Sequence, residues 1–231
     1  MKIIPAILPH SYYDIPHGVE KVFGAVDAVQ IDFVDGHFAS NRTWWFNNKN
    51  KDTLDTLLHE DEGLPHWDEM NYEFDLMVKD PLQYIDTFVA LGPSKIIFHC
   101  ESFLEGLDQE KILNYFETLP EIVRNTITFG MAIGVATDPQ LLTPFVHYID
   151  TIQCMGIQNV GFQGQAFDTR VVEQIKKVKE LFPDKTISVD GAVSLENAQM
   201  LRDAGANTLV VGSLVFLSPD PHGTIHTLER V

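Results

Sequence analysis

The chain has 231 residues, of which 45% are hydrophobic, and this suits one folded unit with a large buried core. With 33 acidic and 16 basic residues, its formal charge of −17 argues against nucleic acid or an anionic membrane surface as a partner. No apolar run approaches the ~18 residues of a membrane span. The segment Met1–Leu8 predicts a strand rather than a signal peptide, so we expect a cytoplasmic protein.

Short runs rich in β-branched residues alternate along the chain with longer amphipathic segments. The predicted strands are 2–8, 27–33, 72–78, 94–99, 127–133, 149–154, 185–190 and 207–211. The predicted helices are 15–24, 50–60, 80–91, 108–120, 138–147, 168–181, 194–204 and 222–229. Strands that alternate with helices in this way predict one α/β domain over residues 1–231, a single (β/α)8 barrel of the TIM type.

Capping residues support several of the predicted helix ends. Asp80 and Asp138 each precede a proline, which places a capping carboxylate before a residue suited to the first helical position. Gly205 predicts the end of helix 194–204. Cys100 and Cys154 each end an apolar run, and we interpret them as buried free thiols.

The segment 39–71 is long and contains the aromatic pair Trp44 and Trp45. This pair has three interpretations: packing against a helix, packing against another subunit of a homo-oligomer, or covering the mouth of the barrel. We favour packing over a cover at the mouth.

Two predicted strands, far apart in sequence, end in an aspartate. Asp32 ends the run Val29–Asp32, and Asp190 ends the run Ile187–Asp190. In a parallel barrel the carboxyl ends of all strands meet at one mouth, where the chemistry takes place. Two carboxylates on opposite sides of a bound sugar can remove a proton from one face and return a proton to the other. The pattern therefore predicts an epimerase, with Asp32 and Asp190 as the catalytic acid and base.

Glycine-rich turns follow the last three predicted strands. They are Gly161-Phe162-Gln163-Gly164 after the sixth, Gly191-Ala192 after the seventh and Gly212-Ser213 after the eighth. Glycines let backbone amides approach an anion, and these loops form the usual phosphate site of such barrels. The turns predict a phosphate site, and ordinary turn chemistry is the alternative.

Taken together in order, these motifs resemble those of the ribulose-phosphate 3-epimerase family. The resemblance rests on Asp32 with Asp35-Gly36-His37-Phe38, Leu76-Met77, His99 with Glu101, the run Gly161–Gln165, Val189-Asp190-Gly191 and Gly212-Ser213. It implies a barrel that inverts carbon 3 of a ketose phosphate, interconverting D-ribulose 5-phosphate and D-xylulose 5-phosphate or a close relative in carbohydrate metabolism. It also implies that Met77 and Met155 line the substrate pocket, although core filling is the alternative.

The resemblance further implies a divalent metal held by two histidines and two aspartates. The aspartates match Asp32 and Asp190, but Gln30 and Asp75 stand where the histidines are expected. A set of Gln30, Asp32, Asp75 and Asp190 offers oxygen ligands, which favour magnesium or manganese over zinc. A site without metal is the alternative, since the carboxylates can instead share a proton. We interpret His99 as a supporting hydrogen-bond partner.

Two other functions stay open at this point. One is a different reaction on a phosphorylated substrate, although no lysine stands at 28–36 or 73–78, where relatives with such reactions often carry one. The other is a phosphosugar-binding protein whose catalysis is altered or lost. In each case the expected partner is a small phosphorylated sugar, and a homo-oligomer stays open.

Overall fold

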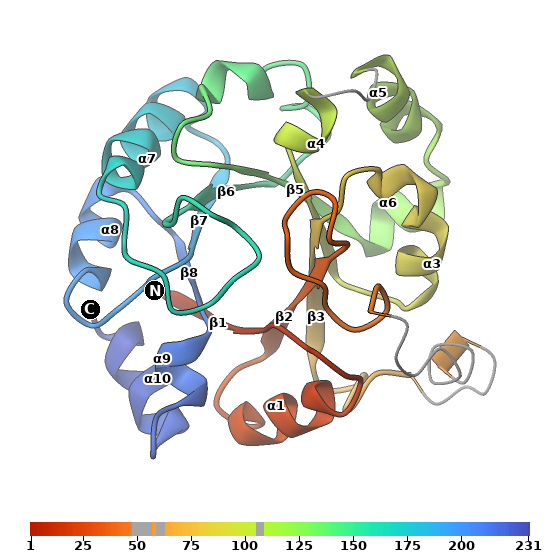
Figure 1. Cartoon of the computed structure of the whole chain (residues 1–231). Helices are drawn as coiled ribbons and strands as arrows, with labels where there is room; N and C mark the ends of the chain where they lie inside the picture. Colours follow the sequence, from red (N-terminus) through yellow and green to blue (C-terminus); the bar gives the residue numbers. More distant parts are fainter. Residues whose placement is uncertain (48–56, 59–62, 105–108) are drawn as a thin grey trace.

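The computed structural model describes residues 1–47, 57–58, 63–104 and 109–231 (Figure 1). Eight parallel strands pair in sequence order and close into a barrel, with the last strand pairing with the first. The strands are β1 (Lys2–Ile7), β2 (Ala28–Val34), β3 (Asn71–Met77), β4 (Lys95–His99), β5 (Thr128–Ile133), β6 (Thr151–Met155), β7 (Thr186–Asp190) and β8 (Thr208–Val211). The predicted (β/α)8 barrel is therefore confirmed.

Helices surround the barrel, as Figure 1 shows in a view down its axis. They are α1 (Asp14–Val22), α3 (Ile85–Ala90), α4 (Glu101–Leu104), α5 (Gln109–Thr118), α6 (Glu121–Thr126), α7 (Arg170–Leu181), α8 (Ala198–Ala204), α9 (Ser213–Phe216) and α10 (Pro221–Glu229), with 3-10 helices η1 (Pro81–Gln83) and η2 (Pro139–Leu142). The predicted helix 50–60 lies almost entirely outside the described residues. In the described part of the chain, no helix has both the length and the apolar character needed to cross a membrane.

Several predicted helices differ from the structure. The helix predicted over 138–147 is only the short η2, because Pro144 lacks an amide hydrogen and its ring disfavours a continuing helix. Asp138 does cap η2, its side chain accepting a hydrogen bond from the Gln140 amide at 3.1 Å. By contrast Asp80 makes no side-chain capping bond within the described residues, and the segment 80–91 splits into η1 and α3.

Three described helices that the sequence did not predict are α4, α6 and α9, which follow β4, α5 and β8. The start of α8 is a reciprocal turn, in which the Ser194 amide donates to Asn197 Oδ1 at 2.8 Å and the Asn197 amide donates to Ser194 Oγ at 3.3 Å. Gly205 ends α8 with a φ of 119°, as predicted.

Alternation along each strand separates an apolar outer layer from a polar interior. On β2, Val29, Ile31 and Phe33 belong to the main hydrophobic core, and the Phe33 ring lies 4.8 Å from that of Phe88 in α3. The residues between them, Gln30 and Asp32, hydrogen-bond inside the barrel. Because strand side chains alternate between faces, the same strands supply both the core and the site.

The aromatic pair belongs to the outer layer, as the packing interpretation predicted. Trp44 is 1% exposed and packs against Tyr12 and Phe33. Trp45 packs against Phe88 of α3, with ring centroids 4.7 Å apart. The pair therefore attaches the loop after β2 to the barrel wall.

An ion pair lies inside the barrel, two residues before the sequence-predicted acid Asp75 along β3. Lys95 Nζ lies 2.9 Å from Glu73 Oε1, and the two side chains are 17% and 7% exposed. The two residues are register partners on β4 and β3. Removing one member of such a pair leaves an uncompensated buried charge.

We expect Lys95→Met to lower the free energy of unfolding by about 3 kcal/mol, because it leaves the Glu73 carboxylate without its ion-pair partner. The double variant Lys95→Met/Glu73→Leu should regain part of that loss in urea unfolding. Lys2→Met is the matched control, because the side chains of Lys2 and its ion-pair partner Asp27 are 49% and 73% exposed. This variant should change the free energy of unfolding by less than ~0.5 kcal/mol. Equal losses in the Lys95 and Lys2 variants would contradict the expectation.

Candidate active site

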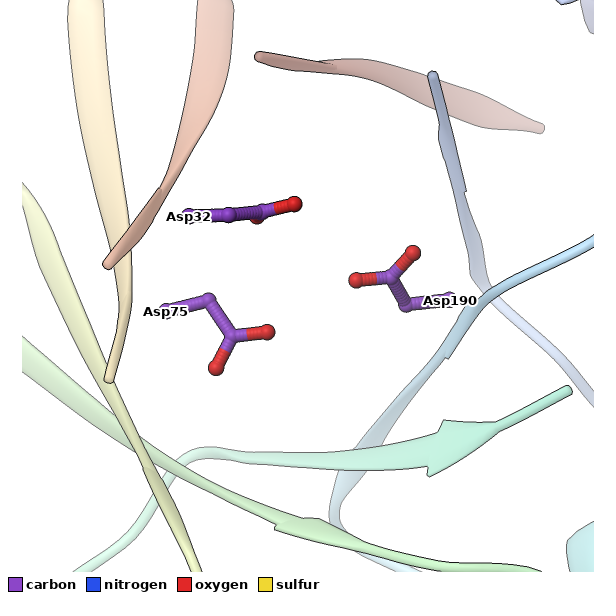
Figure 2. Close-up of side chains that lie close together, drawn as sticks. All are labelled: Asp32, Asp75 and Asp190. Carbon is purple, nitrogen blue, oxygen red and sulfur yellow. The ribbon is translucent and has the colours of Figure 1, made fainter. Parts of the chain in front are cut away.

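Three aspartates converge at the carboxyl end of the barrel (Figure 2). Asp32 on β2 and Asp75 on β3 are register partners, and Asp190 is the last residue of β7. One carboxylate oxygen from each lies within 4.8 Å of the others. Figure 2 shows the side chains of Asp32 and Asp75 pointing across the barrel toward Asp190. The structure thus brings together the three acids that the sequence analysis singled out.

Gln30, the fourth residue of the predicted metal set, bridges two of these acids. Its Nε2 donates to Asp32 Oδ1 at 2.8 Å and to Asp190 Oδ2 at 2.9 Å. Its Oε1 is buried without a hydrogen-bond partner among the described residues. In this conformation Gln30 presents an amide nitrogen to the cluster, so it acts as a hydrogen-bond donor to the carboxylates.

A second amide at the cluster was missed by the sequence analysis. Gln153 Nε2 donates to Asp75 Oδ2 at 3.1 Å and to Asp190 Oδ2 at 3.4 Å. The signal that could have indicated it is a glutamine at an inward position of the otherwise apolar run Ile152–Met155. A polar side chain at such a position is costly unless it is hydrogen-bonded.

His99 supports the cluster from β4, which agrees with its interpretation as a hydrogen-bond partner. The ring is 1% exposed, and its Nε2 lies 2.9 Å from Asp75 Oδ1. Burial lowers the pKa of His99, but the charges of Asp75, Glu101 and Asp190 and the hydrogen bond to Asp75 outweigh it and raise the pKa above the ordinary value. The imidazole thus holds the Asp75 side chain from the β4 side of the cluster.

The two predicted catalytic acids have strongly shifted pKa values. Burial, followed by the charges of Asp190 and Asp75, raises the pKa of Asp32 well above its usual range. Burial and the charge of Asp75 raise the pKa of Asp190 to about 7, against the lowering effects of the Gln30 hydrogen bond, the His99 charge and the Gly191 amide. A carboxyl group that titrates near neutral pH can both accept and deliver a proton.

A cavity of about 80 Å³ opens beside the acids, and Asp32 and Asp190 line it. It is also lined by every residue predicted to bind substrate or phosphate: Met77, Met155, Gly161, Phe162, Gln163, Gly164, Gly191, Ala192, Gly212 and Ser213. Asp75, the register partner of Asp32, is fully buried and does not line the cavity. The structure thus places a paired acid group and the glycine-rich loops around one cavity.

The glycine-rich loops combine left-handed backbone with amides that have no acceptor. Gly161 and Gly164 have φ values of 85° and 75°, in the region that favours glycine. The amides of Gly164, Gly212 and Ser213 have no hydrogen-bond acceptor in the described part of the chain. Such unpaired amides are suited to an anion.

Ala192 has a φ of 53°, which is uncommon for a residue with a Cβ. Its carbonyl is held by Asn197 Nδ2 at 2.9 Å, and Asn197 Oδ1 is itself held by the Ser194 amide. The start of α8 therefore stabilises the strained turn after β7. The neighbouring Gly191 amide faces the Asp190 carboxylate, so it serves the acid cluster.

The donor set fits a hard divalent cation through its carboxylates. Asp32, Asp75 and Asp190 offer oxygen atoms at mutual distances that one ion can bridge. The unpartnered Gln30 Oε1 would join them only if the amide turned, because its nitrogen now faces the acids. Oxygen ligands suit magnesium or manganese, and the described residues bring no thiol or imidazole to the cluster as a direct ligand atom.

Known proteins resemble this chain over almost its whole length. The sequence model of the Ribulose-phosphate 3 epimerase family matches residues 2–216. Ribulose-phosphate 3-epimerase of Bacillus subtilis is 27% identical over 226 residues, covering 95% of this chain and 94% of that protein. The Helicobacter pylori (strain J99) enzyme of the same name is 28% identical over 235 residues, covering 100% and 98%.

Solved structures share the fold. The 3-keto-L-gulonate-6-phosphate decarboxylase from Vibrio cholerae has a TM-score of 0.66 at 14% identity, covering 100% of this chain and 95% of that chain. The 3-hexulose-6-phosphate synthase from Salmonella typhimurium has the same TM-score and identity, covering 100% and 97%. The resemblance that the motifs predicted is confirmed by the family match and by relatives aligned from end to end, and this chain belongs to the ribulose-phosphate 3-epimerase family of isomerases.

Proposed function

We propose that the protein inverts carbon 3 of a ketose phosphate, interconverting D-ribulose 5-phosphate and D-xylulose 5-phosphate or a close relative. The names of its relatives support the reaction. The observation that carries it is that Asp32 and Asp190, with raised pKa values, line the same cavity as the three glycine-rich turns. A phosphate bound at these turns would leave the sugar carbons beside the acids.

In the proposed reaction, one aspartate and its partner act on opposite faces of carbon 3. The ionised carboxylate takes the proton, and the C–H electron pair moves into the bond to carbon 2 and onto its carbonyl oxygen. The other aspartate, protonated, then gives its proton to carbon 3 from the opposite face. Asp32 and Asp190 suit these roles because burial and mutual repulsion favour one proton between them. Which of them removes the proton depends on the direction of the reaction.

Asp32, Asp75 and Asp190 would hold a divalent cation, magnesium or manganese rather than zinc, which supplies positive charge for the oxygen that becomes negative during enolisation. The Gln30 amide keeps Asp32 and Asp190 oriented. The His99 ring keeps the Asp75 carboxylate oriented through its hydrogen bond to Oδ1.

We also propose a cytoplasmic protein whose partner is a small phosphorylated sugar. The described helices offer no membrane span. One relative, from Oryza sativa, is named a cytoplasmic isoform. The open amides at the cavity support an anionic ligand on a chain of net charge −17.

We expect Asp32→Asn and Asp190→Asn each to slow epimerisation by about 10²–10⁴-fold, because each removes one of the two proton-transfer groups. The measurement is exchange of the carbon-3 hydrogen with deuterated water, followed by NMR. Asp203→Asn, an exposed site on α8, is the control and should keep full activity. Absence of exchange in the unmodified protein with pentulose and hexulose phosphates would overturn the function and favour a binding protein.

Stability should depend on pH through Asp190. Its pKa is about 7 in the folded protein and near 3.8 when unfolded, so the folded state binds the extra proton between these values. The free energy of unfolding should therefore fall as pH rises from about 4 to about 7. With chelator present, Asp190→Asn should reduce this fall, leaving the part due to Asp32, whose pKa is also raised. The variant should be more stable than the unmodified protein at pH 8. Parallel stability curves for the two proteins would contradict the expectation.

Metal binding should depend on Asp75. We expect calorimetry to detect manganese or magnesium binding, and Asp75→Asn to weaken it at least about 10-fold because a charged oxygen ligand is lost. Asp138→Asn, which lies at η2 outside the cluster, should bind as the unmodified protein does. Chelation should abolish activity, and zinc should restore it poorly. Full activity after exhaustive chelation would instead indicate a metal-free epimerase.

A further inference from the structure

Gln153 lies inside the barrel, one layer below the acid cluster. Its register partner on β7 is Ser188, whereas Asp190 pairs with Met155 two residues further on. The side chain is 0% exposed, so its hydrogen bonds are made entirely to interior groups. An uncharged amide at this depth is stable only if its polar atoms are paired.

Both ends of the Gln153 amide are paired. Its nitrogen contacts Asp75 and Asp190 in the bonds given above, and its Oε1 accepts a hydrogen bond from Ser188 Oγ at 3.2 Å. The carboxylates, which accept when ionised, face the amide nitrogen, and the Ser188 hydroxyl holds the oxygen end in this orientation. Gln30 differs, because its nitrogen bridges Asp32 and Asp190 and its oxygen has no partner in the described residues.

The two amides thus contact different pairs of carboxylates, with Asp190 in both pairs. Among the described residues, the hydrogen bonds of the Gln153 side chain go to Asp75, Asp190 and Ser188, and those of the Gln30 side chain go to Asp32 and Asp190. A donor between two buried carboxylates offsets their repulsion without adding charge. Without Gln153, Asp75 and Asp190 would lose the donor that they share, and among the described hydrogen bonds only the Gln30 bond to Oδ2 and the Gly191 amide would still hold the Asp190 carboxylate against the repulsion of Asp75.

We propose that Gln153 is a positioning residue that fixes the Asp190 carboxylate for proton transfer, with Ser188 orienting its amide. The inference rests on the proposed two-aspartate epimerisation. Because Gln153 holds Asp190 and not Asp32, its loss acts on one of the two proton transfers. A displaced acid or base slows its own step more than it weakens substrate binding.

The test is the primary isotope effect on kcat/KM, measured in each direction with the carbon-3 deuterated epimers. In Gln153→Leu, turnover should fall about 10- to 100-fold while KM changes less than ~3-fold. The isotope effect should rise for the epimer from which Asp190 takes the proton, because that step now limits the rate. It should fall for the other epimer, since proton removal by Asp32 no longer limits.

Two further variants separate positioning from a general loss of structure. Ser188→Ala keeps the Gln153 side chain and should shift the isotope effects in the same directions by a smaller amount. Gln174→Leu also removes a buried amide, one that donates to the carbonyls of Gly134 and Thr137 away from the cluster, and should leave both isotope effects unchanged. Isotope effects in Gln153→Leu that match those of the unmodified protein would overturn the proposal.

Failure of the proposed function gives a different result, because the unmodified protein would then exchange no carbon-3 hydrogen at all. In that case a crystal structure of Gln153→Leu decides the positioning role directly. An Asp190 carboxylate turned away from Asp75 supports it. An Asp190 carboxylate in its original position overturns it.

Discussion

Repulsion among three closely spaced carboxylates, two of them buried and the third at the cavity, is the constraint around which the interior of this barrel is arranged. Asp32, Asp75 and Asp190 have oxygens within 4.8 Å of one another, in surroundings that screen charge poorly. The side chains that meet them are donors: the amides of Gln30 and Gln153 and the His99 ring. The cluster is therefore held by short polar contacts from three other inward positions, and a change at any one of them alters the charge balance of all.

The proposed phosphate site would meet a second electrostatic demand, that of holding an anion on an acidic protein. The loops after β6, β7 and β8 line the cavity and include backbone amides without an acceptor in the described residues, so the attraction would be local and would need no lysine. The loop after β2 contributes from the other side, where Asn41 Nδ2 donates to the Gly161 carbonyl at 2.8 Å. This contact links the glycine-rich turn after β6 to the strand that carries Asp32.

The barrel and its acids could be predicted from sequence because both depend on local patterns. Strands that end in aspartate, such as Ile187–Asp190, need only the rule that parallel strand ends converge. The role of Gln153 could not be predicted, since a single glutamine acquires partners only when β3 and β7 are placed around it. The orientation of the Gln30 amide likewise depends on a distance across the barrel. The short η2 could have been foreseen from Pro144, which the predicted helix 138–147 ignored.

The division between an apolar outer layer and a polar inner layer has a consequence for how such an enzyme changes over time. Phe33, Phe74 and Phe88 pack between strands and helices, and the site residues on the same strands face the other way. A replacement at Gln30 or Asp75 would therefore alter the acid cluster while the packing that keeps the chain folded stays intact. The residues of the acid cluster can therefore be replaced without loss of the fold. This chain is an example, since Gln30 and Asp75 stand where histidines were expected and the barrel is still closed.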